Sequence, residues 1–201
     1  PPKSVVNALK STHQITLWKG MLNHFGMEEE LDLQPYSLDA TSSNDFRIGI
    51  IPGSANNPSK RWSTDKWCSL IVELLNNSDG LKVSIFGTND DNVIADEICS
   101  TLDDLIIDNL CGKTSLFELG QDLSNCMMVV GNDSGGMHFA NALGAPTVVL
   151  FGPTNPLVTS PFMSATTKIV QSGEPNAGHA GGIDALPVSQ VLNACNELRR
   201  A

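Results

Sequence analysis

Short apolar runs that end in turn residues recur along the chain from residue 46 onward. Four of these runs are clear and two are weaker. The clear runs are FRIGII (46–51), LKVSIFG (81–87), CMMVVG (126–131) and TVVLFG (147–152), and the weaker ones are LIIDNL (105–110) and TKIVQ (167–171). Continuous apolar runs of this length are typical of strands that are buried on both faces of a sheet. The pattern therefore predicts a strand at each of these places.

The segments between the runs have the spacing of amphipathic helices. In one of them Trp67, Leu70 and Leu74 fall on a single face, and in another Ser115 and Glu118 have the spacing of a capping box. Helices are predicted over 64–76, 90–102, 134–143 and 187–200, and from residue 115 onward. Alternating strands and helices with short links predict a doubly wound α/β fold, which is a parallel, Rossmann-like sheet with helices on both faces.

The first 45 residues do not follow this alternation. Residues 4–25 carry apolar side chains at helical spacing, and Gly26 is a typical helix end. The acidic cluster at 28–30 and the turn-rich residues 33–45 follow. We therefore expect residues 1–45 to be a remnant of a preceding domain plus a linker, and residues 46–201 to form the α/β domain.

Composition narrows the possible partners. The formal net charge is −10, and lysine and arginine do not cluster, which argues against a nucleic-acid partner because phosphates require a basic surface. The five cysteines have no CxxC pair and no spacing suited to zinc, so we expect reduced, mostly buried thiols in a cytosolic protein. No apolar run reaches the roughly 18 residues that a membrane helix needs. An anionic ligand would have to be held by local donors.

The loop after the first predicted strand carries such donors. In an open parallel sheet, ligands bind beyond the carboxyl ends of the strands. The segment PGSANNPSKRW (52–62) contains Asn56 and the adjacent cations Lys60 and Arg61. Lys60 is a candidate to hold a phosphate as a point charge. The alternative is a solvated basic turn with Trp62 packed in the core.

The turn after the second strand allows two interpretations. In GTNDD (87–91), the side chains of Thr88 and Asn89 could reach a ribose, or the turn could merely cap the next helix. Capping is the favoured interpretation, because Thr, Asn and Asp are common helix caps.

The segment GNDSGGMH (131–138) predicts an anion site at the start of a helix. The first amides of a helix have no partner within it, and the helix dipole favours negative charge there. Gly135 and Gly136 have no side chain that would keep a phosphate from the backbone. This arrangement explains how an acidic protein can hold an acidic ligand.

The sequence suggests roles for three side chains of this segment, and for two of them it allows two interpretations. Asp133 is either an N-cap or an acceptor for sugar hydroxyls beside a diphosphate. Ser134 and His138 are four residues apart, so we expect them on one helix face that points to the site. His138 either donates to a phosphate oxygen or is a structural histidine.

Taken together, three segments resemble glycosyltransferase family nine, the bacterial ADP-heptose:lipopolysaccharide heptosyltransferases. The resemblance rests, in order and spacing, on PGSANNPSKRW, LCGKTSL (110–116) and GNDSGGMHFANALGAPTVVLFGPTNP (131–156). It implies the GT-B fold, in which two Rossmann-like domains face each other and the C-terminal one holds the nucleotide-sugar donor. It further implies that Lys60 contacts the diphosphate and that residues 133–136 and His138 surround the phosphates and sugar. The turns that contain Thr88, Asn89, Lys113 and Thr114 would approach the nucleoside.

The resemblance also implies a reaction. Heptose would pass from ADP-heptose to the lipopolysaccharide core with inversion and without a metal ion or cofactor, and Lys60 and a helix dipole would stabilise the leaving nucleoside diphosphate. Family members have an N-terminal domain that supplies the acceptor site and the general base, whereas only about 45 residues precede the donor domain here. We therefore expect the donor-binding half of a cytoplasmic enzyme, peripheral to the inner membrane, which binds donor but transfers poorly or not at all alone.

Two alternatives remain open at the level of sequence. A dinucleotide-binding oxidoreductase would need G-x-G-x-x-G after the first strand, and PGSANNPS does not supply it. The other alternative is a non-catalytic nucleotide-binding or protein-interaction module that has the same fold.

Overall fold

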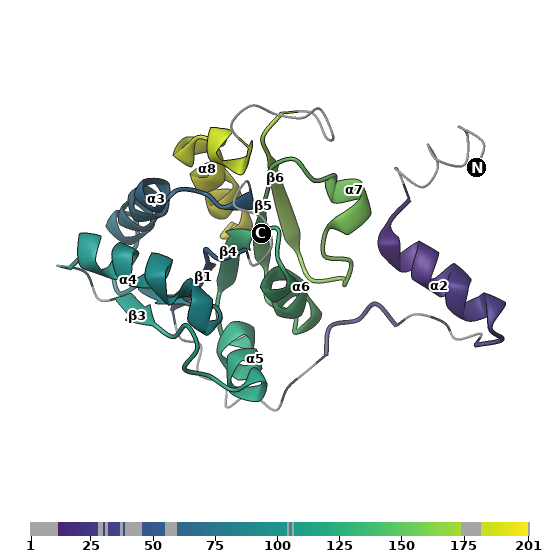
Figure 1. Cartoon of the computed structure of the whole chain (residues 1–201). Helices are drawn as coiled ribbons and strands as arrows, with labels where there is room; N and C mark the ends of the chain where they lie inside the picture. The colour runs from purple at the N-terminus through teal and green to yellow at the C-terminus, as the bar shows by residue number, and fades with distance from the viewer. Residues whose placement is uncertain are drawn as a thin grey trace.

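One parallel sheet organises the part of the chain that the computed structural model describes, which is residues 12–27, 30, 32–36, 38, 46–54, 60–103, 105, 107–173 and 182–200. Within these ranges the sheet has six strands in the order β3-β2-β1-β4-β5-β6, and all of their pairings are parallel (Figure 1). The strands are β1 (Arg47–Ile51), β2 (Lys82–Ile85), β3 (Ile107–Asn109), β4 (Met128–Asn132), β5 (Thr147–Phe151) and β6 (Thr167–Gln171). The strand order reverses between β1 and β4, so a crevice is expected there.

Helices cover both faces of the sheet, as predicted. The described helices are α2 (Gln14–His24), which lies apart from the sheet, and α3 (Thr64–Asn76), α4 (Asn92–Thr101), α5 (Leu116–Ser124), α6 (Gly135–Ala142), α7 (Pro156–Thr159) and α8 (Val188–Leu198), with 3-10 turns η2 (Asn89–Asp91) and η3 (Gly182–Ala185). Alternate residues of β1 enter different cores, because side chains along a strand point to opposite faces. Ile48 and Ile50 pack with residues of α3, α4 and α8, whereas Ile51 packs with residues of α5 and α6. The doubly wound fold is therefore confirmed.

The predicted elements agree with the structure in type and differ at some ends. All of the predicted strands form, including the two weaker ones, and α3 has the predicted bounds. The predicted helix over 90–102 begins as the 3-10 turn η2 and continues as α4. Two short elements, α7 and η3, were not predicted.

A helix was predicted over residues 4–25, and the structure describes its C-terminal part as α2 (Gln14–His24). Residues 1–11 lie outside the described ranges, and Thr12 and His13 are not helical. Helix α2 begins at Gln14 because His13 is its N-cap, with Nδ1 of the ring accepting from the Ile15 amide at 3.3 Å. A histidine cap gives no signal at the level of sequence.

Helix α2 lies beside α7, away from the sheet (Figure 1). It buries none of its residues, and apolar side chains such as Trp18 and Phe25 are exposed. Nε2 of His13 lies 2.9 Å from the carbonyl oxygen of Ser160, and the Ser164 amide donates to the Leu33 carbonyl at 2.9 Å. These contacts tie the N-terminal segment to the loop between α7 and β6.

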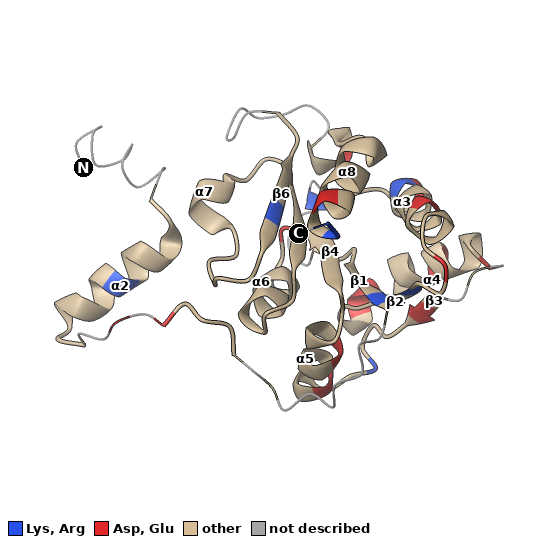
Figure 2. Cartoon of the chain, turned by 180° about the vertical axis from the view of Figure 1, so that it is seen from behind, with Lys and Arg blue, Asp and Glu red and all other residues tan. Residues whose placement is uncertain are grey.

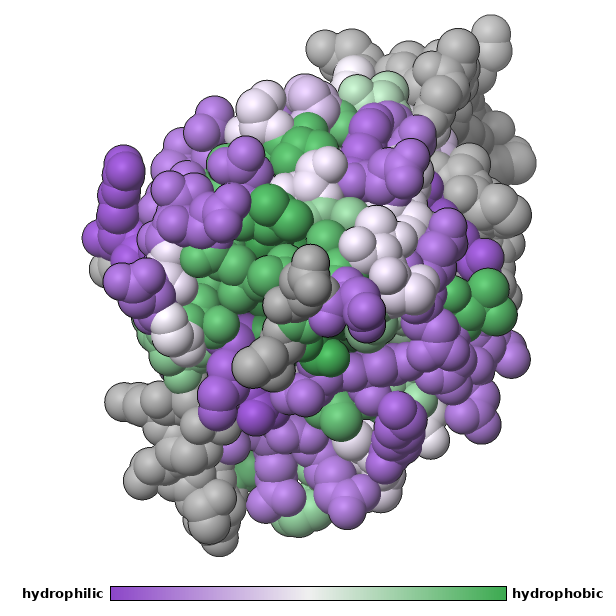
Figure 3. All heavy atoms as spheres, turned by 90° about the vertical axis from the view of Figure 1, so that its left-hand side faces the viewer, coloured by the Kyte–Doolittle hydropathy of each residue, from purple (hydrophilic) through white to green (hydrophobic). Residues whose placement is uncertain are grey.

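The surface is acidic, and its apolar areas are local. In the described ranges the basic residues are scattered over several elements (Figure 2), so they do not form the continuous basic face that nucleic-acid binding requires. The side that carries α4 and β3 shows an apolar area among polar residues (Figure 3). None of the described helices is long and apolar enough to cross a bilayer.

Candidate functional site

A cavity of about 480 Å³ opens where β1, β2 and β4 end. Ile51 is the last residue of β1, Phe86 follows β2, and Asp133 follows β4. The cavity is lined by Ile51, Gly53, Ser54, Lys60, Phe86, Gly87, Thr88, Asp91, Leu116, Leu119, Asp133, Ser134, Gly135, Gly136 and Phe139. It therefore occupies the crevice at the reversal of strand order, which is where ligands bind in open α/β sheets.

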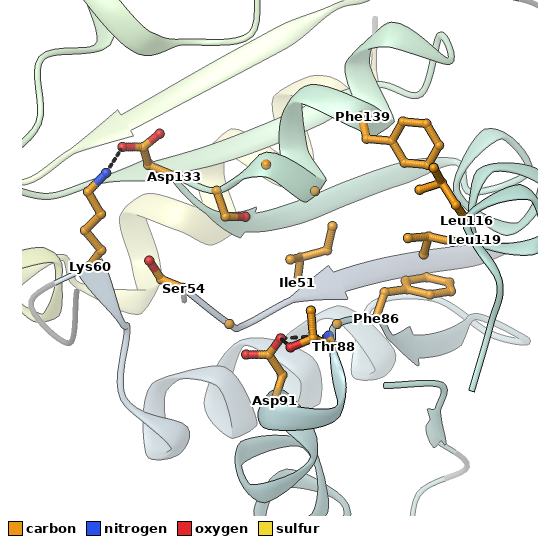
Figure 4. Close-up of a pocket in the computed structure, with 15 residues that line it drawn as sticks. Ile51, Ser54, Lys60, Phe86, Thr88, Asp91, Leu116, Leu119, Asp133 and Phe139 are labelled. Atoms are coloured by element: carbon orange, nitrogen blue, oxygen red, sulfur yellow. Dashed lines mark hydrogen bonds and ion pairs between the residues drawn. The ribbon is translucent and has the colours of Figure 1, made fainter. Parts of the chain in front are cut away.

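The polar end of the cavity centres on Asp133. Its side chain is only 7% exposed, and Nζ of Lys60 donates to its Oδ2 at 2.7 Å (Figure 4). The hydroxyl of Thr154 donates to the same oxygen, also at 2.7 Å. The interpretation of Asp133 as an N-cap is wrong, because the N-cap of α6 is Ser134. The structure instead makes Asp133 the acceptor for two donors from distant parts of the chain.

The segment around Trp62 fixes the place of Lys60. The Trp62 ring is fully buried, meets the Trp67 ring edge-on at 5.0 Å, and donates its Nε1 hydrogen to the Leu186 carbonyl at 3.0 Å. Nε of Arg61 donates to the Ser54 carbonyl at 3.1 Å. Trp62 does pack in the core, as one interpretation held, and this anchor is what directs Lys60 to the cavity.

The start of α6 forms one wall of the polar end. Ser134 has extended backbone, Gly135 and Gly136 open the helix, and all three line the cavity. A side chain on Gly135 would meet nothing within 4 Å, whereas a Cβ on Gly136 would lie 2.9 Å from Cδ1 of Ile51. Gly136 is therefore also a packing contact with β1. The first amides of this helix have no partner within it and are available to an anion.

The opposite end of the cavity is apolar. Phe86, Leu116, Leu119 and Phe139 gather there, with Ile51 between the two ends (Figure 4). They come from the end of β2 and from α5 and α6. The sequence analysis missed these residues, because apolar positions on an amphipathic helix look the same whether they line a cavity or fill a core.

Thr88 and Asp91 form the cap that was predicted for their turn, and contact with a ribose stays a prediction. The amide and the hydroxyl of Thr88 each donate to Oδ2 of Asp91 at 2.8 Å, which completes a capping box. The predicted cap is therefore confirmed, and both side chains also line the cavity. Gly53 faces this carboxylate so closely that any side chain at that position would collide with Asp91.

Several predicted site residues lie elsewhere. Within the described ranges, the cavity lining does not include Arg61, Asn89, Lys113, Thr114 or His138, and Asn56 lies outside those ranges. Nζ of Lys113 donates to the Asn109 carbonyl at 2.8 Å. The side chain of Asn89 fills the space beside Gly112, whose φ of 65° suits glycine.

Ser134 caps α6 and lines the cavity, whereas His138, on α6, is not among the described residues that line it. The structure therefore does not place both side chains at the cavity. The pKa of His138 is lowered, chiefly by burial, while nearby Asp133 and a hydrogen bond to the Thr159 backbone act in the opposite direction. The ring is therefore neutral near pH 7 and keeps one N–H donor, so its contact with a phosphate stays a prediction.

The described side chains show neither a disulfide nor a metal cluster. Cys68, Cys111, Cys126 and Cys195 are buried and Cys99 is half-buried, and none of the five forms a disulfide within the described ranges, in line with the expected reduced, mostly buried thiols. In the described ranges no three His, Cys, Asp or Glu side chains gather in a way that could hold a metal ion.

Comparisons with known proteins identify the family. A model of glycosyltransferase family 9 (heptosyltransferase) matches residues 17–180. The chain belongs to glycosyltransferase family 9. Lipooligosaccharide heptosyltransferase 2 of Haemophilus influenzae is 35% identical to this family 9 chain over 164 residues, which cover 75% of the chain and 46% of that protein. Lipopolysaccharide heptosyltransferase 2 of Salmonella typhimurium is 35% identical over 208 residues, which cover 98% of the chain and 58% of that protein.

Solved structures of family members share the fold of this family 9 chain. The structure of E. coli ADP-heptose lps heptosyltransferase II superposes with a TM-score of 0.69 at 28% identity, covering 89% of this chain and 50% of that one. A family 9 glycosyl transferase from Veillonella parvula gives a TM-score of 0.81 at 21% identity, which bears on fold alone. The chain spans about half the length of the relatives it matches.

Proposed function

We propose that this chain is the donor-binding half of a heptosyltransferase that uses ADP-heptose and acts on the lipopolysaccharide core. One observation carries the proposal: a single cavity has a cation and helix amides at one end and an apolar wall at the other. A nucleoside diphosphate-sugar has the matching two parts: charged phosphates, which suit the cation and the amides, and an aromatic base, which suits the apolar wall. The names of the family 9 relatives point to the same substrates.

Each part of the donor has a matching part of the cavity. The diphosphate lies against the amides of Gly135 and Gly136, with Lys60 as its counter-ion. The sugar hydroxyls donate to Oδ1 of Asp133, because Oδ2 accepts from Thr154 and, before donor binds, also from Lys60. The base lies at the apolar end, and the ribose lies between the two ends, near Asp91. The GT-B arrangement and the division between residues 45 and 46 are also part of the proposal.

The proposed reaction is a single displacement with inversion. An acceptor hydroxyl attacks the anomeric carbon of heptose, the bond from that carbon to the β-phosphate oxygen breaks, and ADP leaves with the electron pair. Lys60 and the α6 amides stabilise the charge that develops on the leaving group, without a metal ion or cofactor. The proton passes to a general base that the family resemblance assigns to an N-terminal domain. The expected cytoplasmic location, peripheral to the inner membrane, belongs to the same proposal.

Titration calorimetry with ADP tests the donor site. We expect the wild-type chain to bind ADP and Lys60→Ala to bind it about ten to one hundred times more weakly, because a charge-assisted contact is worth about 1.5–3 kcal/mol. Lys168→Ala is the matched control. Lys168 pairs with Glu197 on the surface at 2.8 Å, so its loss should leave ADP affinity unchanged.

The same titrations separate the alternatives. Tighter binding of NAD than of ADP would favour the oxidoreductase. No binding of ADP, UDP, GDP or CDP would contradict the proposal and favour a module without donor binding. Equal loss of affinity in Lys60→Ala and Lys168→Ala would refute the assignment of the diphosphate to the polar end.

A further inference from the structure

Thr154 reaches Asp133 from the neighbouring strand. It lies in the turn after β5, and β5 pairs with β4 so that Leu150 stands beside Asn132. The amide of Asp133 donates to the Leu150 carbonyl at 2.9 Å, which extends this pairing past the end of β4. The turn after β5 and the Asp133 side chain therefore meet at the carboxyl edge of the sheet.

The backbone of this turn is held on three sides. Nε2 of Gln171, on β6, donates to the Thr154 carbonyl at 3.2 Å. Gly152 lies so close to η3 that a Cβ there would be 2.7 Å from the Ile183 amide nitrogen. The Asn155 side chain accepts from the Leu157 amide at 3.0 Å and caps α7. The Thr154 hydroxyl is thus presented from a fixed support.

The two donors on Oδ2 of Asp133 differ in freedom. Lys60 has a long, flexible side chain that is 23% exposed and lines the cavity, whereas Thr154 is short and fixed by its turn. In the proposed function Lys60 serves the diphosphate, so its ammonium group is drawn from Asp133 toward the phosphates when donor binds. A carboxylate that is 7% exposed and loses its cation is left in an unfavourable state unless another donor remains.

We propose that Thr154 is a positioning residue that supplies this remaining donor. Its hydroxyl holds Oδ2 of Asp133 while Lys60 turns to the diphosphate, and it keeps Oδ1 toward the cavity for the sugar. Release of Lys60 then costs less free energy, and ADP binds more tightly. This inference rests on the proposed function, because it needs a diphosphate as the group that draws Lys60 away.

Thr154→Val tests the inference, because it removes the hydroxyl and keeps the shape of the side chain. We expect ADP affinity, measured by calorimetry, to fall about tenfold, which is the effect of losing about 1.4 kcal/mol. Thr154→Ser keeps the hydroxyl and should stay within about threefold of wild type, and Thr154→Ala serves as a second deletion. The matched control is Thr64→Val, because the Thr64 hydroxyl donates to the Glu97 carboxylate at 2.9 Å on α3 and α4, away from the cavity lining.

A double-mutant cycle with Lys60→Ala separates positioning from general support. Without Lys60 no lysine has to leave Asp133 when ADP binds, so Thr154→Val should lower ADP affinity less than threefold in that background. A merely structural role would lower affinity by the same factor in both backgrounds. Thermal unfolding of each variant reports its folding independently.

The outcomes assign failure to different claims. If the wild-type chain does not bind ADP, the proposed function and this inference fall together. If the wild-type chain binds ADP and Thr154→Val binds it equally well, only the inference is overturned. An equal loss in Thr154→Ser, or an undiminished loss in the Lys60→Ala background, overturns it as well.

Discussion

Asp133 holds the polar end of the cavity together. Its Oδ2 accepts hydrogen bonds from Lys60, in the loop after β1, and from Thr154, in the turn after β5, and the residue itself directly follows β4. Three segments therefore converge on one side chain. Convergence of this kind holds a site geometry more firmly than any single contact, because each donor limits the movement of the others.

His138 should make the folding stability of the chain depend on pH. Burial lowers its pKa in the folded chain, and His13 and Lys60 act in the same direction, against Asp133 and the Thr159 backbone. The unfolded chain takes up the proton near pH 6.5, above the folded pKa, so acid favours unfolding. The contribution of this ring should be fully present above about pH 6.5, decline as the pH falls from there to the lowered pKa of the folded chain, and level off below it.

His138→Gln measures this contribution. Gln has no titratable ring, so the melting temperature of the variant should fall less than that of wild type between about pH 7.5 and about pH 5.5. The control is His24→Gln, because His24 is exposed in the last turn of α2. Equal acid shifts in wild type and His138→Gln, recorded by circular dichroism, would show that burial of this ring does not limit stability.

Residue chemistry made part of the site predictable. Lys60 stood out as one of two adjacent cations in the loop after a strand, and Asp133 as an acidic residue at a glycine-containing helix start, and the structure joins them. Thr154 and Asp91 gave no such signal, because Thr and Asp in turns normally serve backbone turns and caps. Their place at the cavity depends on which strands are neighbours, and strand order is not encoded locally.

Helix α5 shows how a short sequence motif fixes the start of a helix that lines the cavity. Ser115 caps the helix, with its hydroxyl accepting from the Glu118 amide at 3.3 Å and its amide donating to the Glu118 carboxylate at 2.8 Å. These contacts also lower the pKa of Glu118. The first turn that they fix carries Leu116 and leads to Leu119 at the apolar end of the cavity.

Ser115→Ala should therefore affect stability more than binding. Loss of a serine cap costs about 1 kcal/mol, which corresponds to a fall in melting temperature of about 2–4 °C for a chain of this size. ADP affinity should fall less than threefold, because the apolar wall frays but is not removed. Ser69→Ala is the control: the Ser69 hydroxyl donates to a carbonyl of its own helix at 2.8 Å, and its loss should cost nothing measurable. Equal melting temperatures in Ser115→Ala and wild type would mean that the cap does not stabilise α5.

Elements with a strong period were predictable, and short or context-dependent ones were not. β1 and α3 have clear apolar patterns, and they form where the pattern places them. α7 spans only four residues and η3 another four, too few for a period to appear. Both are held by their neighbours: Ser63 donates its amide to Asp184 of η3 at 2.9 Å, which joins segments over one hundred residues apart.

At the scale of the whole molecule, the sheet and the helices that flank it enclose a buried core, whereas α2 contributes no buried residue to it. The described residues of α2 are all at least partly exposed, including Trp18 and Met21. An apolar face of this kind normally marks an interaction surface.

We predict that the chain binds ADP-heptose but does not transfer heptose by itself. A general base must accept a proton from the acceptor hydroxyl, so it needs a carboxylate or imidazole that is not committed to other donors. Among the described residues, the two carboxylates that line the cavity are both engaged. Asp133 accepts from Thr154 and, in the proposed donor complex, from the sugar hydroxyls, and Asp91 accepts from the amide and hydroxyl of Thr88. Neither is therefore expected to act as the base.

Release of ADP from ADP-heptose in the presence of a lipopolysaccharide core acceptor measures transfer, and calorimetry on the same sample measures donor binding. We expect the wild-type chain to bind ADP-heptose and to release ADP no faster than the Asp133→Asn variant does. Repeated turnover by the wild-type chain would contradict the prediction, and the Asn variants would then identify the base. Turnover lost in Asp91→Asn and kept in Asp133→Asn would assign the role of base to Asp91, beside the ribose, whereas the reverse would assign it to Asp133. Binding without turnover in every variant would place the proton acceptor beyond the residues that line this cavity.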